Sequence, residues 1–145
     1  MSELTITRIF DAPRELVFRA WTDPDQFARW LGPRGFEATS VTIDLRPGGR
    51  WRACIRAADG IEQWSSGTYR EIVEPERLVF TFAWESGDVA GEQTVVTVTL
   101  ADLGGKTELT FHQAGFSAVA DRDTHRSGWA STLDRLAEFL VRQGD

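Results

Sequence analysis

The chain has 145 residues and a formal net charge of −6, and 11% of its residues are aromatic, including six Trp. This length fits one domain, residues 1–145, and the acidic balance with scattered basic residues argues against nucleic acid or an anionic membrane as a partner. A single cysteine, Cys54, excludes an internal disulfide and a multi-thiolate metal site, and the absence of a long apolar stretch predicts a cytoplasmic protein without a membrane span.

The first third of the chain predicts one strand followed by two short helices. Residues 3–10 are β-branched and partly alternating, which is typical of a strand. Pro13 suits the first turn of a helix that runs to about Trp21. A second short helix follows, with Asp23 as its N-cap and Pro24 at its first position. Both helices therefore precede the remaining strands.

Residues 38–113 predict six further strands. Turn signals rich in Gly, Pro and Asp separate them at residues 46–49, 59–60, 74–76, 86–91 and 104–105. Together with the first strand they make a seven-stranded, largely antiparallel sheet.

The last predicted element is a helix over residues 122–142. Trp129, Leu133, Leu136 and Leu140 recur at spacings of four, three and four, which forms one apolar stripe. A helix of about 20 residues is about 30 Å long, enough to cross the whole sheet. The expected class is α+β, with one curved sheet wrapped around one long helix.

Turn lengths predict which strand residues face one another. A two-residue turn at Asp59-Gly60 pairs Ile55 with Trp64 and Trp51 with Thr68. Because directly opposed residues share a face of the sheet, Trp51, Ile55 and Trp64 are expected on one side. In the same way, the last hairpin pairs Leu100 with Leu109 and Val98 with Phe111, and it places His112 on the wetter face.

The middle hairpins leave two alternatives open. With a turn at Pro75-Glu76, strict alternation puts Tyr69 and Phe82 on the face opposite to Trp51. Two apolar faces are difficult to accommodate in one sheet, and a β-bulge near Ser66-Gly67 would bring all these rings to the inner face. The alternative is a second apolar patch that a dimer partner or the short helices cover.

The sequence offers few groups for chemistry. It contains no nucleophile elbow, no His-Glu-x-x-His and no phosphate-binding glycine loop. His112 and His125 have no partner at metal-ligand or triad spacing. Under the bulge model Glu71 would point inward, where Arg52 or Arg70 could pair with it. No catalytic residue, metal or cofactor is therefore expected, and a binding protein is favoured over an enzyme.

An ordered set of short segments resembles a known family. Two of the segments are Trp30-Leu31-Gly32-Pro33 and Pro75-Glu76-Arg77-Leu78. The whole set of segments occupies residues 12–18, 21–24, 30–33, 44–49, 71–72, 75–80 and 125–140. These segments resemble the small bacterial relatives of the heat-shock protein 90 ATPase activator, within the START-like (SRPBCC) superfamily. The resemblance implies a helix-grip fold, with a cavity between the curved sheet and the C-terminal helix. It also implies that residues 32–36 edge the mouth of that cavity.

The resemblance implies three functions to test. The first is binding of a small apolar or aromatic molecule in the cavity, since superfamily members bind lipids, sterols, polyketides and hormones. The second is a co-chaperone-like contact with a heat-shock ATPase in a stress response, and the third is a cyclase or hydrolase acting on a polyketide-like substrate. A homodimer is a further open alternative. The candidate ligand-binding residues are Trp30, Phe36, Trp51, Trp64, Tyr69, Glu71, Phe80, Phe82, Trp84, Trp129 and Leu133.

Overall fold

The structure is a computed structural model that describes residues 2–87 and 90–143, so part of the predicted turn at 86–91 lies outside the described residues. The described chain folds into the predicted order of one strand, two short helices, six strands and one long helix. The elements are β1 (Ser2–Phe10), α1 (Arg14–Thr22), α2 (Pro24–Trp30), β2 (Phe36–Ile43), β3 (Arg50–Ala57), β4 (Glu62–Val73), β5 (Arg77–Trp84), β6 (Thr94–Asp102), β7 (Thr107–Phe116) and α3 (Val119–Gln143).

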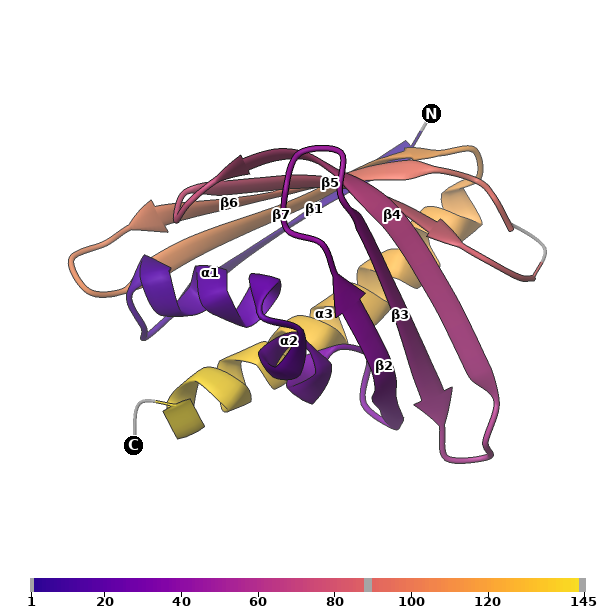
Figure 1. Ribbon diagram of the computed structural model, residues 1–145, viewed down its shortest axis with the longest axis horizontal. Helices are drawn as coiled ribbons and strands as arrows, with labels where there is room; N and C mark the ends of the chain where they lie inside the picture. Colours follow the sequence, from indigo (N-terminus) through magenta and orange to yellow (C-terminus); the bar gives the residue numbers. More distant parts are fainter. Residues whose placement is uncertain (1, 88–89, 144–145) are drawn as a thin grey trace.

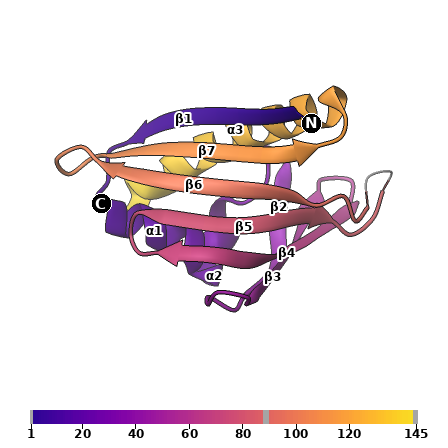
Figure 2. The ribbon, with the colours of Figure 1, turned by 90° about the horizontal axis from the view of Figure 1, so that it is seen from above.

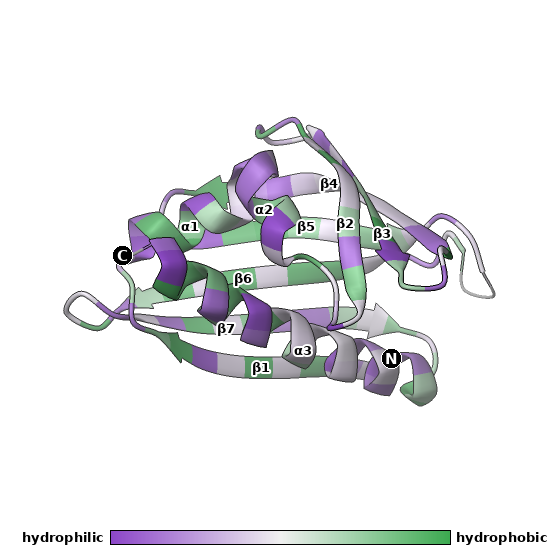
Figure 3. Ribbon diagram, turned by 90° about the horizontal axis from the view of Figure 1, so that it is seen from below, coloured by the Kyte–Doolittle hydropathy of each residue, from purple (hydrophilic) through white to green (hydrophobic). Residues whose placement is uncertain are grey.

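The seven strands form one antiparallel sheet in the order β1-β7-β6-β5-β4-β3-β2. The sheet curves over α3, and α1 and α2 lie on the same concave side (Figure 1). Seen from above, the strands cover the helices (Figure 2). Seen from below, α3 runs along β1 and β7, while β2 and β3 lie across from its N-terminal half (Figure 3). The predicted α+β helix-grip fold is confirmed.

Capping residues set the ends of the helices. The Asp23 carboxylate accepts a hydrogen bond from the backbone N–H of Asp25 at 2.9 Å, which caps α2 at its N-terminus. The long helix α3 begins at Val119, earlier than predicted, so Asp121 lies within its first turn. A carboxylate in that turn complements the positive end of the helix dipole.

Aromatic rings from the short helices join the core beneath the sheet. Trp21 of α1 packs at 4.8 Å between ring centroids against Trp30 of α2, and at 6.0 Å against Trp129 of α3. The Trp30 indole N–H donates to the backbone carbonyl of Ala20 at 3.1 Å, which satisfies its buried polar atom. Leu133 and Leu136 of α3 are fully buried against this cluster. These contacts fix α1 and α2 against α3.

The β3–β4 hairpin differs by one residue from the predicted register. Its loop has three residues and ends at Gly60, whose φ of +89° suits a glycine, so Trp64 lies opposite Cys54 and Gly67 lies opposite Trp51. A shift of one residue moves every side chain to the other face. The prediction that Trp64 points inward is therefore wrong.

The correct register removes the need for a bulge at Ser66-Gly67. Ser65, Gly67 and Tyr69 alternate onto the inner face without interruption, and Tyr69 lies opposite Phe80. The irregularity in the β4–β5 ladder falls instead between Tyr69 and Glu71. Beyond it, Glu71 lies on the outer face, where its carboxylate pairs with Arg77 at 3.2 Å. The predicted inward position of Glu71 is thus wrong.

The β6–β7 hairpin has the predicted register. Leu100 lies opposite Leu109 and Val98 lies opposite Phe111, and all four side chains are buried in the core. His112 lies opposite Thr97 on the outer face, and its Nε2 is 3.3 Å from the Glu3 carboxylate. From this hairpin, Phe111 contacts α3, since its ring centroid lies 4.5 Å from that of Trp129.

Candidate functional site

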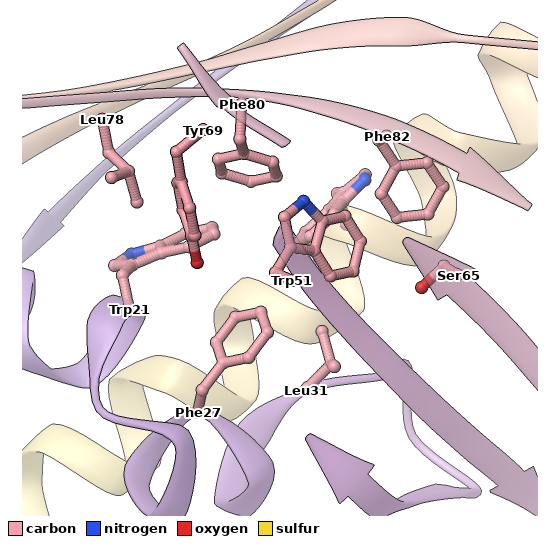
Figure 4. Close-up of a pocket in the computed structure, with 10 residues that line it drawn as sticks. Trp21, Phe27, Leu31, Trp51, Ser65, Tyr69, Leu78, Phe80 and Phe82 are labelled. Atoms are coloured by element: carbon pink, nitrogen blue, oxygen red, sulfur yellow. The ribbon is translucent and has the colours of Figure 1, made fainter. Parts of the chain in front are cut away.

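The inner part of the space between the sheet and the helices is filled by aromatic rings. Tyr69 and Phe80 from the sheet point toward Trp21 and Phe27 from the helices, and Trp51 closes one side (Figure 4). The void left among these rings has a volume of about 20 Å³. That is room for about one water molecule. This inner region therefore belongs to the core, and burial raises the pKa of Tyr69.

Trp51 reaches its place because Gly67 has no side chain. The Trp51 indole N–H passes over Gly67 on β4 and donates to the backbone carbonyl of Thr81 on β5 at 3.0 Å. The backbone N–H of Thr68 donates to the Thr81 hydroxyl at 2.9 Å. A Cβ on Gly67 would lie 1.8 Å from the Thr81 carbonyl oxygen and 2.7 Å from the Trp51 indole nitrogen. The close packing of Trp51 over Gly67 belongs to the filled, inner part of the space between the sheet and the helices.

The outer part of the same space is an open cleft of about 760 Å³. It lies between the N-terminal half of α3, the inner face of β3–β5 and the loop at residues 31–35. Its volume falls within the range of about 300–1,000 Å³ that is usual for small-molecule sites. Apolar and aromatic side chains make most of its sheet side, and polar side chains make most of its helix side. Its lining residues are Leu31, Gly32, Pro33, Phe36, Ile55, Gln63, Ser65, Phe82, Trp84, Asp123, Thr124, His125, Ser127, Gly128, Trp129, Ser131 and Thr132.

The wall of the cleft that α3 forms carries serine and threonine hydroxyl groups and one glycine. The Thr124 hydroxyl donates to the carbonyl of Ala120 at 3.0 Å, and the Thr132 hydroxyl donates to the carbonyl of Gly128 at 2.8 Å. A Cβ added to Gly128 would meet no atom within 4 Å. The helix backbone at Gly128 is therefore open to the cleft, at a cost in helix propensity of about 1 kcal/mol relative to Ala.

The loop at residues 31–35 is fastened to α3 by Arg135. Its guanidinium donates to the backbone carbonyls of Leu31 at 3.2 Å, Gly32 at 2.8 Å and Phe36 at 3.1 Å. Burial lowers the pKa of Arg135, although the guanidinium stays charged at neutral pH. Arg34 adds an exposed ion pair with Glu138. The mouth of the cleft is thus held by a defined set of bonds.

His125 of α3 lies between aromatic rings at one end of the cleft. Its Nε2 accepts a hydrogen bond from the Trp84 indole N–H at 3.1 Å, so its ring is neutral in this arrangement. Its ring centroid lies 5.4 Å from that of Phe82 and 4.9 Å from that of Phe116. Burial lowers the pKa of His125, and the nearby carboxylates of Asp121 and Glu92 offset part of that shift.

The His125 arrangement predicts a loss of stability in acid. The folded state disfavours the protonated imidazole, whereas the unfolded state takes up its proton near an ordinary pKa of about 6.5. The free energy of unfolding should therefore fall as the pH drops below about 6.5. Urea unfolding at pH 8 and pH 5.5 should show a larger fall for the wild type than for His125→Gln. The same pH dependence in both proteins would contradict this expectation.

The structure brings some of the sequence-predicted site residues to the cleft and leaves others elsewhere. Phe36, Phe82, Trp84 and Trp129 line the cleft. The other predicted residues on the inner side, Trp51, Tyr69, Phe80, Trp30 and Leu133, lie in the core.

Trp64 and Glu71 lie on the outer face of the sheet. The Arg52 guanidinium stacks 3.9 Å from the centroid of the Trp64 ring and also pairs with the Glu85 carboxylate, which lowers the pKa of Glu85. The side chains of Glu71 and Arg52 are 47% and 49% exposed and have different partners. The inward Glu71–Arg52 pair considered for a cyclase or hydrolase therefore does not form.

Sequence reasoning missed the polar wall of the cleft. Thr124, Ser127, Ser131 and Gly128 recur at helical spacing beside the apolar stripe that begins at Trp129. A glycine in the middle of a long helix is an available signal, since it costs stability without ending the helix. The predicted position of residues 32–36 is supported, because Gly32, Pro33 and Phe36 border the cleft.

The described residues, 2–87 and 90–143, contain neither a helix suited to cross a membrane nor a group of metal ligands. No helix in this part of the chain combines the length and the apolar character that crossing a membrane requires. Within the same residues, no three His, Cys, Asp or Glu side chains gather as metal ligands would.

A protein-family model matches most of this chain. A family model described as "Activator of Hsp90 ATPase homolog 1-like protein" matches residues 11–141. A search of curated proteins found no match to this chain.

Solved structures match the chain over nearly its whole length. A protein from Chromobacterium violaceum is 30% identical, with a TM-score of 0.86 over 97% of this chain and 98% of the other. The AHSA1 protein from Silicibacter pomeroyi is 23% identical, with a TM-score of 0.87 over 98% of this chain and 99% of the other. A protein from Mycobacterium smegmatis is 26% identical, with a TM-score of 0.80 over 95% and 90%. The helix-grip arrangement is thus shared with solved structures from several bacteria.

Proposed function

Because the chain belongs to the Activator of Hsp90 ATPase homolog 1-like family, with its START-like fold, we propose that it binds a small apolar or aromatic molecule in the cleft beside α3. The single observation that carries the proposal is the cleft of about 760 Å³ between α3 and the sheet. Ile55, Phe82 and Trp84 offer apolar surface there, and flat aromatic rings suit ligands that combine apolar faces with polar groups.

The contrast between the two parts of the interior supports this proposal. The inner rings leave about 20 Å³ and pack as a core, whereas the outer cleft is large. Four residues border both spaces, namely Leu31, Ser65, Phe82 and Trp129. A ligand would therefore rest on the rim of a rigid aromatic core, and its binding would not require that core to unpack.

Gly128 allows a direct test of the proposal. The neutral dye N-phenyl-1-naphthylamine, whose emission rises in apolar surroundings, should bind the wild type, and Gly128→Leu should weaken that binding by at least about tenfold. The reason is that a side chain at Gly128 extends into the cleft and meets no protein atom within 4 Å at its Cβ. Fluorescence titration gives both affinities.

Gly128→Ala is the matched control. Its methyl group occupies little of the cleft, so dye affinity should stay close to that of the wild type. Alanine should also raise the free energy of unfolding by about 0.5–1 kcal/mol, because it removes the entropic cost of a mid-helix glycine. Equal dye affinities for the Leu and Ala variants would place the dye elsewhere and contradict the proposal.

A second candidate function is contact with an Hsp90-type chaperone. The family match favours it, and the outer face of the sheet carries a patch in which Arg52 stacks on Trp64 and pairs with Glu85. Arg50 and Arg56 flank this patch on the same strand. Unchanged ATPase turnover of the chaperone from the same organism on addition of this protein would remove this candidate.

A further inference from the structure

We infer that the cleft takes uncharged ligands with a hydrogen-bonding edge and discriminates against organic anions of the same shape. The inference rests on the proposed function, because it specifies the ligand class of the same cleft. Its first support is the charge of the walls. Among the described residues that line the cleft, none is Lys or Arg, and only Asp123 and His125 can ionise. The cleft thus presents a carboxylate and no permanent cation.

The arginines near the cleft already have partners. Arg135 donates to four backbone carbonyls in and beside the loop, and Arg34 pairs with Glu138. On α3, Arg122 pairs with Asp123 at 3.0 Å, and Arg126 donates to the carbonyl of Thr5 at 3.3 Å. An anion in the cleft would have to break one of these arrangements to gain a cationic partner.

Carboxylates also surround the end of the cleft at His125. Asp121 of α3 and Glu92, which precedes β6, lie beside the His125 ring and line a small adjoining void with it. The Glu92 carboxylate accepts hydrogen bonds from the Ser117 backbone N–H at 2.8 Å and from its hydroxyl at 2.9 Å. The pKa of Glu92 is accordingly lowered, so the carboxylate stays ionised at neutral pH. The local field there is negative and opposes a bound anion.

The hydroxyl groups of α3 determine which polar groups a ligand can place against this wall of the cleft. Thr124 and Thr132 donate their hydroxyl protons to carbonyls of their own helix, so toward any further partner their oxygens act as acceptors. Thr124 is exposed, whereas Thr132 is buried. The Ser131 oxygen accepts from the backbone N–H of Arg34 at 2.9 Å, so its own proton can point to a ligand. Ser127 is exposed beside them. A neutral hydroxyl or amine can use both the donors and the acceptors of this wall, whereas a carboxylate can use only the donors.

The energetic consequence follows from desolvation. An organic anion that enters the cleft gives up part of its hydration, and without a cation or a set of donors it recovers little of that free energy. A neutral molecule with the same aromatic skeleton gives up far less. Net charge acts in the same direction, because the whole chain carries −6.

Two fluorescent dyes with one skeleton test the inference. N-phenyl-1-naphthylamine is neutral, and 1-anilinonaphthalene-8-sulfonate differs from it by one sulfonate. At pH 8, where His125 is neutral, the sulfonate should bind at least about tenfold more weakly. Equal or tighter binding of the sulfonate would overturn the inference and leave the proposed function intact. If neither dye binds up to its solubility limit, both the proposed function and the inference fail.

A charge-introducing variant gives an independent check. Ser127→Arg places a guanidinium at the cleft and should strengthen binding of the sulfonate dye relative to the neutral one. Val141→Arg is the matched control, since Val141 is 65% exposed near the C-terminal end of α3 and changes the net charge equally. The affinity ratio of the two dyes should move in Ser127→Arg only. An equal shift in both variants would trace the selectivity to net charge and would overturn the assignment to the cleft walls.

Discussion

Gly67→Ala is expected to lower the free energy of unfolding by about 3 kcal/mol or more, the largest loss among the substitutions considered. The added Cβ would lie 1.8 Å from the backbone carbonyl oxygen of Thr81, which cannot rotate away as a side chain could. Strands β4 and β5 would have to separate, and the bond from the Trp51 indole N–H to that oxygen would be lost. Urea unfolding monitored by circular dichroism measures the change.

The same change at Gly128 is the control for Gly67→Ala. Both substitutions add one methyl group, but at Gly128 the new Cβ meets no atom within 4 Å, so the sign of the effect should reverse. Adding Trp51→Phe to Gly67→Ala should not restore stability, because the closest clash is with the backbone of Thr81. A loss below about 1 kcal/mol for Gly67→Ala would show that the two strands are not held as closely as described.

Arg135→Met is expected to lower the free energy of unfolding by about 2–3 kcal/mol. Methionine keeps most of the aliphatic stem but cannot donate to the backbone carbonyls of Leu31, Gly32 and Phe36. Those carbonyls would then lack the cationic donor that now joins the loop to α3. Because the loop borders the cleft, the affinity for N-phenyl-1-naphthylamine should fall as well. Urea unfolding and dye titration measure the two effects.

Arg34→Met provides the comparison for Arg135. Both arginines join the loop at residues 31–35 to α3, but Arg34 does so mainly through an exposed ion pair with Glu138. Exposed ion pairs contribute little to stability because water and salt screen them. Arg34→Met should therefore change stability much less than Arg135→Met. Equal effects of the two substitutions would contradict the role assigned to the buried carbonyl contacts.

The sequence could predict the order of elements and the fold class, but only part of the register. In the β6–β7 hairpin, the turn at Gly104-Gly105 and the apolar pairing of Leu100 and Val98 indicate the same register, and that register forms. At Asp59-Gly60 the same residues suit a two-residue turn or a three-residue loop that ends in glycine. The three-residue loop forms, and it moves Trp64 to the outer face. Local turn chemistry could not decide between them.

The candidate site was predictable to a smaller extent. Strict alternation with the predicted turn separates Trp51 from Tyr69 and Phe80, and these rings share the inner face because the β3–β4 register differs by one residue. No sequence pattern tells whether such rings leave space or fill it. That outcome depends on how far β3–β5 bend away from α3, which involves contacts between distant parts of the chain. The hydrogen bond between Trp84 and His125 also joins residues 41 positions apart. Sequence spacing alone gives no signal for such a pair.

The most direct test of the account is to locate a bound molecule by NMR. Intermolecular nuclear Overhauser effects between N-phenyl-1-naphthylamine and the isotope-labelled protein should connect the dye to Ile55, Phe82 and the α-protons of Gly128, which border the cleft. Contacts with Trp21, Phe27 or Phe80 of the inner core, with Trp64 on the outer face, or with no defined set of residues would contradict the claim that the cleft beside α3 is the binding site.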